Sequence, residues 1–118
     1  LSELHGHVMP RSAFSTVTSG GQEDHVSMGA TACMNLMLAI DRFTDVLAAE
    51  LMIAAESAED LECPMSTPLQ DLHRLVRMEV PKLSTDRSTA EDLRIIGDRL
   101  RSGRWWSELS ASTPLMDE

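Results

Sequence analysis

A long apolar run without proline, from Val26 to about Ala55, most constrains what this chain can fold into. Its only charged residues are Asp41, Arg42, Asp45 and Glu50. The run and its flanks predict one continuous helix from about Asp24 to Glu59, roughly 50 Å long at about 1.5 Å per residue. Between residues 30 and 40 apolar side chains occupy every face, so this helix must be buried all round.

The surroundings that bury this helix must be protein. A membrane span needs about 20 apolar residues, and Thr31, Asn35 and the Asp41-Arg42 pair interrupt the run. The residues after the helix are enough for two short helices, which cannot surround so long a rod. We therefore expect the chain either to oligomerise through this helix or to be a segment of a larger helical protein.

Composition supports an all-α fold and limits the partners. The 118 residues include eight methionines, no tyrosine and only 3% aromatic residues, whereas strands draw on aromatic and β-branched side chains. The length suits one domain at most. A formal charge of −9 argues against a surface for nucleic acid or an anionic membrane, because both require clustered Lys and Arg.

The two cysteines, Cys33 and Cys63, are separated by most of the long helix and are too far apart for a disulfide. We expect buried free thiols in a reducing compartment, and hence a cytoplasmic protein. The chain opens with neither a signal peptide nor a methionine, so we expect it to be a piece of something longer.

Residues 1–21 show neither helical nor alternating periodicity and are predicted to be a loop. His5 and His7 are spaced so that an extended backbone would let them share a metal ion. No third ligand accompanies them, so no metal site is predicted.

Two short helices are predicted within residues 61–104, followed by a tail over 105–118. Capping-box patterns open the helices at Thr67 and Ser88, Pro81 stops the first, and Gly103 suits the end of the second. Their apolar stripes comprise Leu69, Leu72, Leu75, Val76 and Val80 in the first, and Leu93, Ile96, Gly97 and Leu100 in the second. In the tail, at least one of Trp105 and Trp106 is predicted to pack as a structural anchor.

The densest group of polar residues is Gln22-Glu23-Asp24-His25, at the expected start of the long helix. Composition alone favours helix capping there, with Asp24 accepting backbone N–H bonds and Glu23 opposing the helix dipole. Glycine-rich phosphate loops, nucleophile elbows and His-Glu-x-x-His zinc motifs are absent from the sequence.

Residues 22–29, Gln-Glu-Asp-His-Val-Ser-Met-Gly, resemble the signature in the C-terminal half of histidine ammonia-lyases. The similarity extends backward through residues 7–12 and Thr18-Ser19, which resemble that family's His-Pro-x-Ser and Thr-Ser lead-in. It extends forward through residues 46–55, 80–83 and Asp86-Arg87. The resemblance thus covers most of the chain.

The resemblance implies an all-α homotetrameric lyase in which long helices form a central bundle. Its electrophile is a methylidene-imidazolone, which forms from an internal Ala-Ser-Gly and takes the substrate amine, while a tyrosine removes the β-proton. Glu23 would be a catalytic residue that faces the imidazole of L-histidine, with Gln22 beside it in the substrate site, and the product would be urocanate. A carboxylate suits histidine because it accepts from a ring N–H, whereas a phenyl ring would leave it unpaired.

The sequence also departs from that family's pattern. It contains neither Ala-Ser-Gly nor tyrosine, so the cofactor and the base would come from residues outside this chain. Phe14-Ser15 replaces the usual Asp-Ser pair, and Cys33-Met34-Asn35 stands where basic residues often follow the signature. The alternatives are a tyrosine or phenylalanine lyase, an aminomutase, or a non-catalytic helical oligomerisation module.

Overall fold

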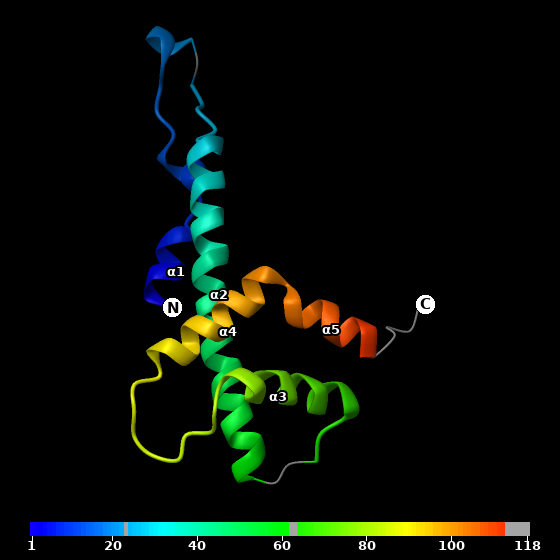
Figure 1. Cartoon of the computed structure of the whole chain (residues 1–118). Coiled ribbons are helices and arrows are strands. Elements are labelled where there is room, and N and C mark those ends of the chain that lie inside the picture. The colour runs from blue at the N-terminus through cyan, green and yellow to red at the C-terminus, as the bar shows by residue number, and fades with distance from the viewer. Residues whose placement is uncertain (23, 62–63, 113–118) are drawn as a thin grey trace. The chain divides into compact units, whose positions relative to one another are not determined.

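The computed structural model describes residues 1–22, 24–61 and 64–112, and the elements within them are helical (Figure 1). Five α-helices follow one another: α1 (Ser2–His7), α2 (Gly29–Asp60), α3 (Thr67–Glu79), α4 (Ala90–Ser102) and α5 (Arg104–Ser112). The chain divides into two compact units, residues 1–43 and residues 44–118. The predicted all-α class is confirmed.

The first unit contains more regular structure than the predicted loop over residues 1–21. Besides α1, the segments Arg11–Phe14 and Ser19–Gly21 form 3-10 turns. In α1, Glu3 lies in the first turn and His5 and His7 in the last, which suits the helix dipole. The loop prediction was wrong for these residues because six residues with a central glycine are too short to show a helical stripe.

Contacts with α2 hold this N-terminal segment within the first unit. Arg42 lies 3.6 Å from the Glu3 carboxylate, which is also 3.8 Å from His7. Arg11 donates to the carbonyl of Gly6 at 3.3 Å. When the Asn35 amide is oriented with its oxygen toward Arg11, that oxygen accepts from the Arg11 guanidinium as well. These bonds explain how a segment of low helix propensity becomes ordered.

The long helix begins later than predicted. It runs from Gly29 to Asp60, and its 32 residues correspond to about 48 Å. Residues 24–28 are not helical, and Met28 has a φ of 52°. A left-handed residue cannot continue a right-handed helix, so the predicted start at Asp24 was wrong, and with it the assignment of Asp24 to the helix terminus. The predicted capping role of Glu23 falls on a residue outside the described ones.

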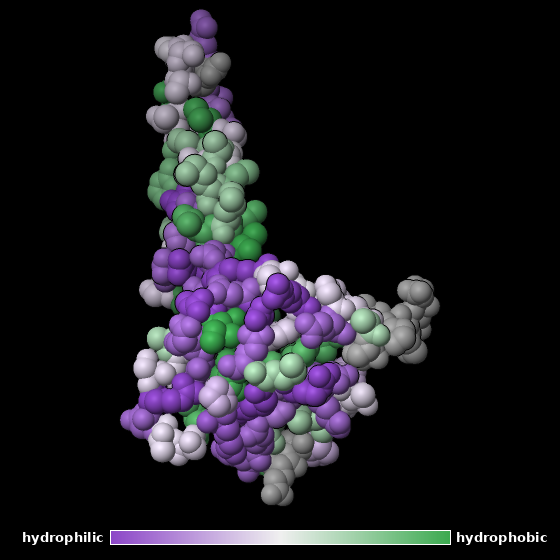
Figure 2. Space-filling view, in the orientation of Figure 1, coloured by the Kyte–Doolittle hydropathy of each residue, from purple (hydrophilic) through white to green (hydrophobic). Residues whose placement is uncertain are grey.

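Burial differs sharply along α2. In its first part only Ala39 is buried, whereas a group of large apolar side chains is exposed (Figure 2). This group, the α2 apolar patch, comprises Met34, Leu36, Met37, Leu38, Ile40 and Phe43. Cys33 is exposed too, which contradicts the predicted buried thiol, while Cys63 lies outside the described residues. The described residues of the first unit therefore do not bury this part of α2.

The second unit has a core built from α2 to α5. The buried members are Ala48, Met52, Ala55, Leu75, Val76, Val80, Ile96 and Trp105. Ile96 and Val76 are fully buried, as their predicted stripe positions require. Small residues on α2, chiefly alanines, let the other helices approach closely, and the aliphatic side chains of α3 and α4 fill the space.

The two predicted short helices are confirmed, although their starts differ in detail. The residue before α3 is Ser66, and the residue before α4 is Thr89; neither forms a capping hydrogen bond through its side chain. Gly103 ends α4 with a φ of 67°, as predicted. This left-handed residue permits the chain to turn directly into α5.

The predicted tail is largely helix. Helix α5 was missed because only nine residues form it and its apolar stripe is short. Trp105 is 4% exposed and belongs to the core, whereas Trp106 is 63% exposed. The predicted tryptophan anchor is thus confirmed, and Trp105 is the residue that provides it. Residues 113–118 lie outside the described part.

Ion pairs between α2 and α3 complete the second unit. Arg77 on α3 lies 2.6 Å from Glu59 and 2.9 Å from Glu56, both on α2. The hydrogen bond from Arg77 holds the pKa of Glu59 below its ordinary value of 4.5. Lys82, after α3, lies 2.6 Å from Asp60, and that hydrogen bond raises the pKa of Lys82.

Candidate functional site

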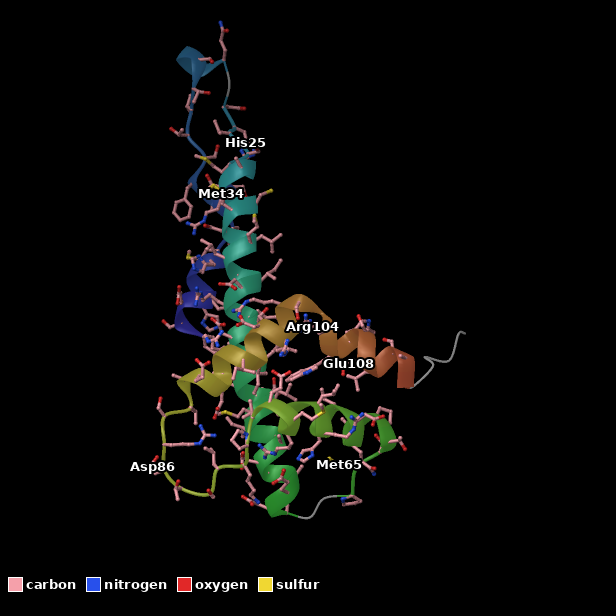
Figure 3. All side chains as sticks on the ribbon, viewed as in Figure 1. His25, Met34, Met65, Asp86, Arg104 and Glu108 are labelled. Atoms are coloured by element: carbon pink, nitrogen blue, oxygen red, sulfur yellow. The ribbon has the colours of Figure 1, made fainter. Side chains whose placement is uncertain are left out.

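The signature residues lie in a loop that precedes α2. Gln22 follows the Ser19–Gly21 turn, donating its backbone N–H to the carbonyl of Ser19 at 3.2 Å. Gln22, Asp24 and His25 are exposed, and His25 lies close to the first turn of α2 (Figure 3). Glu23, the predicted catalytic residue, lies outside the described residues. The Gln22 amide, the Asp24 carboxylate and the His25 imidazole are thus exposed on the surface of this chain.

The loop carries an unusual concentration of left-handed backbone. Ser19, Gly20 and Gly21 have φ values of 54°, 64° and 87°, and Met28 has 52°. Glycine adopts this region at little cost, but Ser19 and Met28 each store strain on the order of 1 kcal/mol. Such strained residues cluster at functional sites, where the surrounding structure must hold them in place. Ser19 lies three residues before the signature, and Met28 is its seventh residue.

A side chain fastens the returning end of this loop. The hydroxyl of Ser15 accepts a hydrogen bond from the backbone N–H of Val26 at 2.8 Å, and both residues are half-buried. Ser15 directly follows the Arg11–Phe14 turn, whereas Val26 directly follows His25. The bond therefore joins the chain before the signature to the middle of the signature, at Val26.

A cleft of 270 Å³ lies between the N-terminal segment and α2 of the first unit. Its lining residues are His7, Val8, Met9, Pro10, Arg11, Ala32, Asn35, Leu36 and Ala39. Arg11 and Asn35 are its chief polar groups. Sequence reasoning did not single them out for a contact, although both stand out as polar residues beside apolar runs.

His5 and His7 lie on α1 rather than on an extended strand. Residues two apart on a helix do not face each other, and His7 is near Glu3 instead. Among the described residues, no three His, Cys, Asp or Glu side chains gather as a metal site requires.

The second unit offers a pocket of different character. Its volume is 180 Å³, and its lining, between α2 and α3, is almost entirely apolar. The exception is His73, whose Nε2 lies 2.8 Å from a Glu59 oxygen. Glu59 also lies 2.6 Å from Arg77, so this histidine lies beside the ion pairs that join α2 to α3.

The forward part of the resemblance has a structural role in the second unit. Val80 is buried, and the N–H of Leu83 donates to the Glu56 carboxylate at 3.3 Å. Asp86 lies in the loop between α3 and α4 (Figure 3), and Arg87 lies 2.7 Å from the buried Asp92. These residues stabilise the connection between the two helices.

Comparison with known proteins decides the family. The family model described as aromatic amino acid lyase matches residues 1–78, which include the signature, its lead-in and the whole of α2. The chain belongs to this family. The match shows that the α2 apolar patch and the exposed signature belong to one family segment.

Three curated relatives are histidine ammonia-lyases. The protein from Caenorhabditis elegans is 37% identical over 98 residues, covering 82% of this chain and 14% of its own length. That from Koribacter versatilis is 37% identical over 97 residues, covering 80% and 19%. That from Natranaerobius thermophilus is 33% identical over 110 residues, covering 92% and 22%.

A solved structure agrees with this family fold. The crystal structure of histidine ammonia-lyase from Trypanosoma cruzi matches 96% of this lyase-family chain with a TM-score of 0.83 and 31% identity. The match covers 23% of that protein. The chain thus spans only about a fifth of the length of the proteins it resembles.

Among the described residues, no helix combines the length and apolarity that crossing a bilayer requires.

Proposed function

We propose that this chain is the C-terminal segment of a histidine ammonia-lyase, which eliminates ammonia from L-histidine to give urocanate. The observation that carries the proposal is the segment Gln22–Gly29, which resembles the histidine ammonia-lyase signature in a chain whose relatives named above are histidine enzymes. The exposed position of Gln22, Asp24 and His25 supports it, because a substrate site completed by other parts of the enzyme needs these groups uncovered.

Glu23 is the proposed catalytic and substrate-binding residue, with Gln22 as a second substrate-binding residue. A carboxylate accepts a hydrogen bond from an imidazole N–H and stabilises the charge of a protonated ring. The amide of Gln22 can donate and accept beside it. Glu23 would therefore select histidine over phenylalanine, whose ring offers no N–H.

We assign the methylidene-imidazolone cofactor to residues outside this chain, because the sequence contains no Ala-Ser-Gly. That group supplies the electrophile for the substrate amine. The proton-abstracting tyrosine must also lie elsewhere, since the chain has none. What this chain contributes is recognition of the substrate side chain and a long helix on which other parts of the enzyme pack.

We further propose that the α2 apolar patch packs against the remainder of the lyase chain and other subunits of a homotetramer in the cytoplasm. Six large apolar side chains within ten residues are exposed here, and contiguous exposed apolar surface of this kind marks an interaction site. This packing would restore the all-round burial that the sequence of α2 demands.

The exposed patch also favours a second candidate, a non-catalytic helical oligomerisation module. An upstream coding region that contains Ala-Ser-Gly supports the lyase, whereas an intact gene product with the 13.0 kDa mass of this chain supports the module. A tyrosine or phenylalanine lyase, or an aminomutase, is the alternative within the family, and Phe14 in place of the usual Asp favours it.

The complete enzyme carrying Glu23→Ala tests the assignment. We expect kcat for L-histidine to fall at least about 100-fold, in the range that the loss of a positioned proton-transfer or charge-stabilising group produces, with Tm nearly unchanged. Glu23→Gln should lower kcat/KM for histidine more than for phenylalanine. Urocanate formation can be followed by its absorbance. Unchanged histidine turnover in Glu23→Ala would contradict the proposed substrate.

A further inference from the structure

We propose that Ser15 is a positioning residue that holds the signature loop in its productive conformation. The proposal rests on the proposed function and deepens it. Ser15 bonds to the backbone of Val26, which immediately follows the exposed His25. In the sequence, Ser15 precedes the loop, whereas α2 follows it. No role of this residue follows from the signature itself, which begins seven positions later.

A long-range hydrogen bond closes the base of the signature loop. The Ser15 hydroxyl accepts from the Val26 N–H at 2.8 Å across eleven positions of sequence. The two half-buried residues bound a loop whose described signature residues, Gln22, Asp24 and His25, are all exposed. Side chains exposed in this manner receive little support from packing, so the backbone bonds at the base of the loop determine where they lie.

Strained backbone lies near this hydrogen bond. Ser19, three residues before the signature, and Met28, within it, are held with positive φ. Such conformations persist only when neighbouring contacts hold them. Val26 is two residues before Met28, and its N–H bond to Ser15 limits how the backbone can relax there. Removing the Ser15 hydroxyl takes this acceptor away from the half-buried Val26 N–H and lets this end of the loop relax.

The position of the signature loop affects the rate of the proposed reaction. A small displacement of a positioned group lowers the rate of the chemical step even where no contact with substrate is lost. Ser15 acts through the backbone that carries Gln22 to His25. Loss of the Ser15 hydroxyl should therefore weaken the interaction that the signature makes with histidine. Once Glu23 is removed and that interaction is absent, loss of the hydroxyl should lower the activity little further.

The test is a double-mutant cycle of Ser15→Ala and Glu23→Ala in the complete enzyme. We expect Ser15→Ala alone to lower kcat/KM for histidine about tenfold, with a smaller loss for phenylalanine, and to have no further effect in the Glu23→Ala background. Ser15→Thr, which keeps the hydroxyl, should restore most of the activity. Thr16→Ala, which removes an exposed neighbouring hydroxyl, should stay within about twofold of the parent.

Hydrogen exchange at the Val26 amide, measured with residue resolution in the same proteins, provides a readout that does not depend on activity. We expect faster exchange in Ser15→Ala than in Ser15→Thr. Unchanged exchange, or an equal loss from Ser15→Ala with and without Glu23, overturns the positioning role. Unchanged histidine turnover in Glu23→Ala instead overturns the proposed function, and the exchange result then decides separately whether Ser15 anchors the loop.

Discussion

The two parts of α2 have similar apolar content but opposite surroundings. In the second unit Ala48, Met52 and Ala55 are buried against α3 to α5. In the first unit the α2 apolar patch is exposed, and among the described residues of this part of α2 only Ala39 is buried. One helix therefore passes from a region with a core of its own to one without. The difference teaches that hydrophobic periodicity reports the burial a segment requires, whereas the source of that burial depends on which partners are present.

The largest expected effect tests what buries the patch. Met37 and Met78 are 72% and 71% exposed, in the first and second units respectively. In the complete protein, Met37→Glu should weaken subunit association by a factor of ten or more, since burying an unpaired charge in an interface costs several kcal/mol. Met78→Glu is the matched control, because it alters an equally exposed methionine on α3. Analytical ultracentrifugation over a concentration series measures both.

If Met37→Glu and Met78→Glu weakened subunit association equally, the α2 apolar patch would not be a preferred interface. The proposed difference between the surfaces of the two units would then be wrong.

A second comparison measures the cores directly. Ile96 is fully buried and Ile40 is 59% exposed. In the 118-residue chain, Ile96→Ala should lower the free energy of unfolding by about 3 kcal/mol through lost burial and a residual cavity. Ile40→Ala should cost about 0.5 kcal/mol or less. In the complete enzyme, where other parts cover the patch, the cost of Ile40→Ala should rise. Urea unfolding gives these values; similar losses in the isolated chain would contradict the absence of a core around Ile40.

The smallest expected effect concerns charge. Arg77 lowers the pKa of Glu59, so this carboxylate stabilises the fold above its ordinary pKa of 4.5, and that contribution disappears as the pH falls through the lower folded value. Glu59→Gln should remove about 1 kcal/mol or less at neutral pH and reduce the loss of stability below about pH 5. Thermal unfolding between neutral pH and about pH 3 measures this.

The control is Glu3→Gln in the first unit, where the carboxylate is 66% exposed and 3.6 Å from Arg42. Surface pairs of this kind contribute little, so its unfolding profile should follow that of the parent. A larger effect from Glu3 than from Glu59 would reverse the expected difference between the units.

Local patterns determined much of this protein in advance. The proline-free run predicted α2, the stripes predicted α3 and α4, and Gly103 predicted the left-handed end of α4. The signature octapeptide pointed to the family that the comparison confirms. These features depend on residues close together in sequence, where spacing and backbone preference act directly.

Tertiary structure decided the rest. Neighbouring tryptophans are indistinguishable in the sequence, yet only Trp105 reaches the core, because the turn at Gly103 sets the rotation of α5. Helix α1 forms through contacts with α2 rather than through propensity. The left-handed backbone at Met28 delays the start of α2. Ser15 accepts a hydrogen bond from Val26, eleven positions away, which no local sequence pattern predicts. In each case the deciding contact joins residues distant in sequence or depends on the packing of a whole unit, which a short window cannot contain.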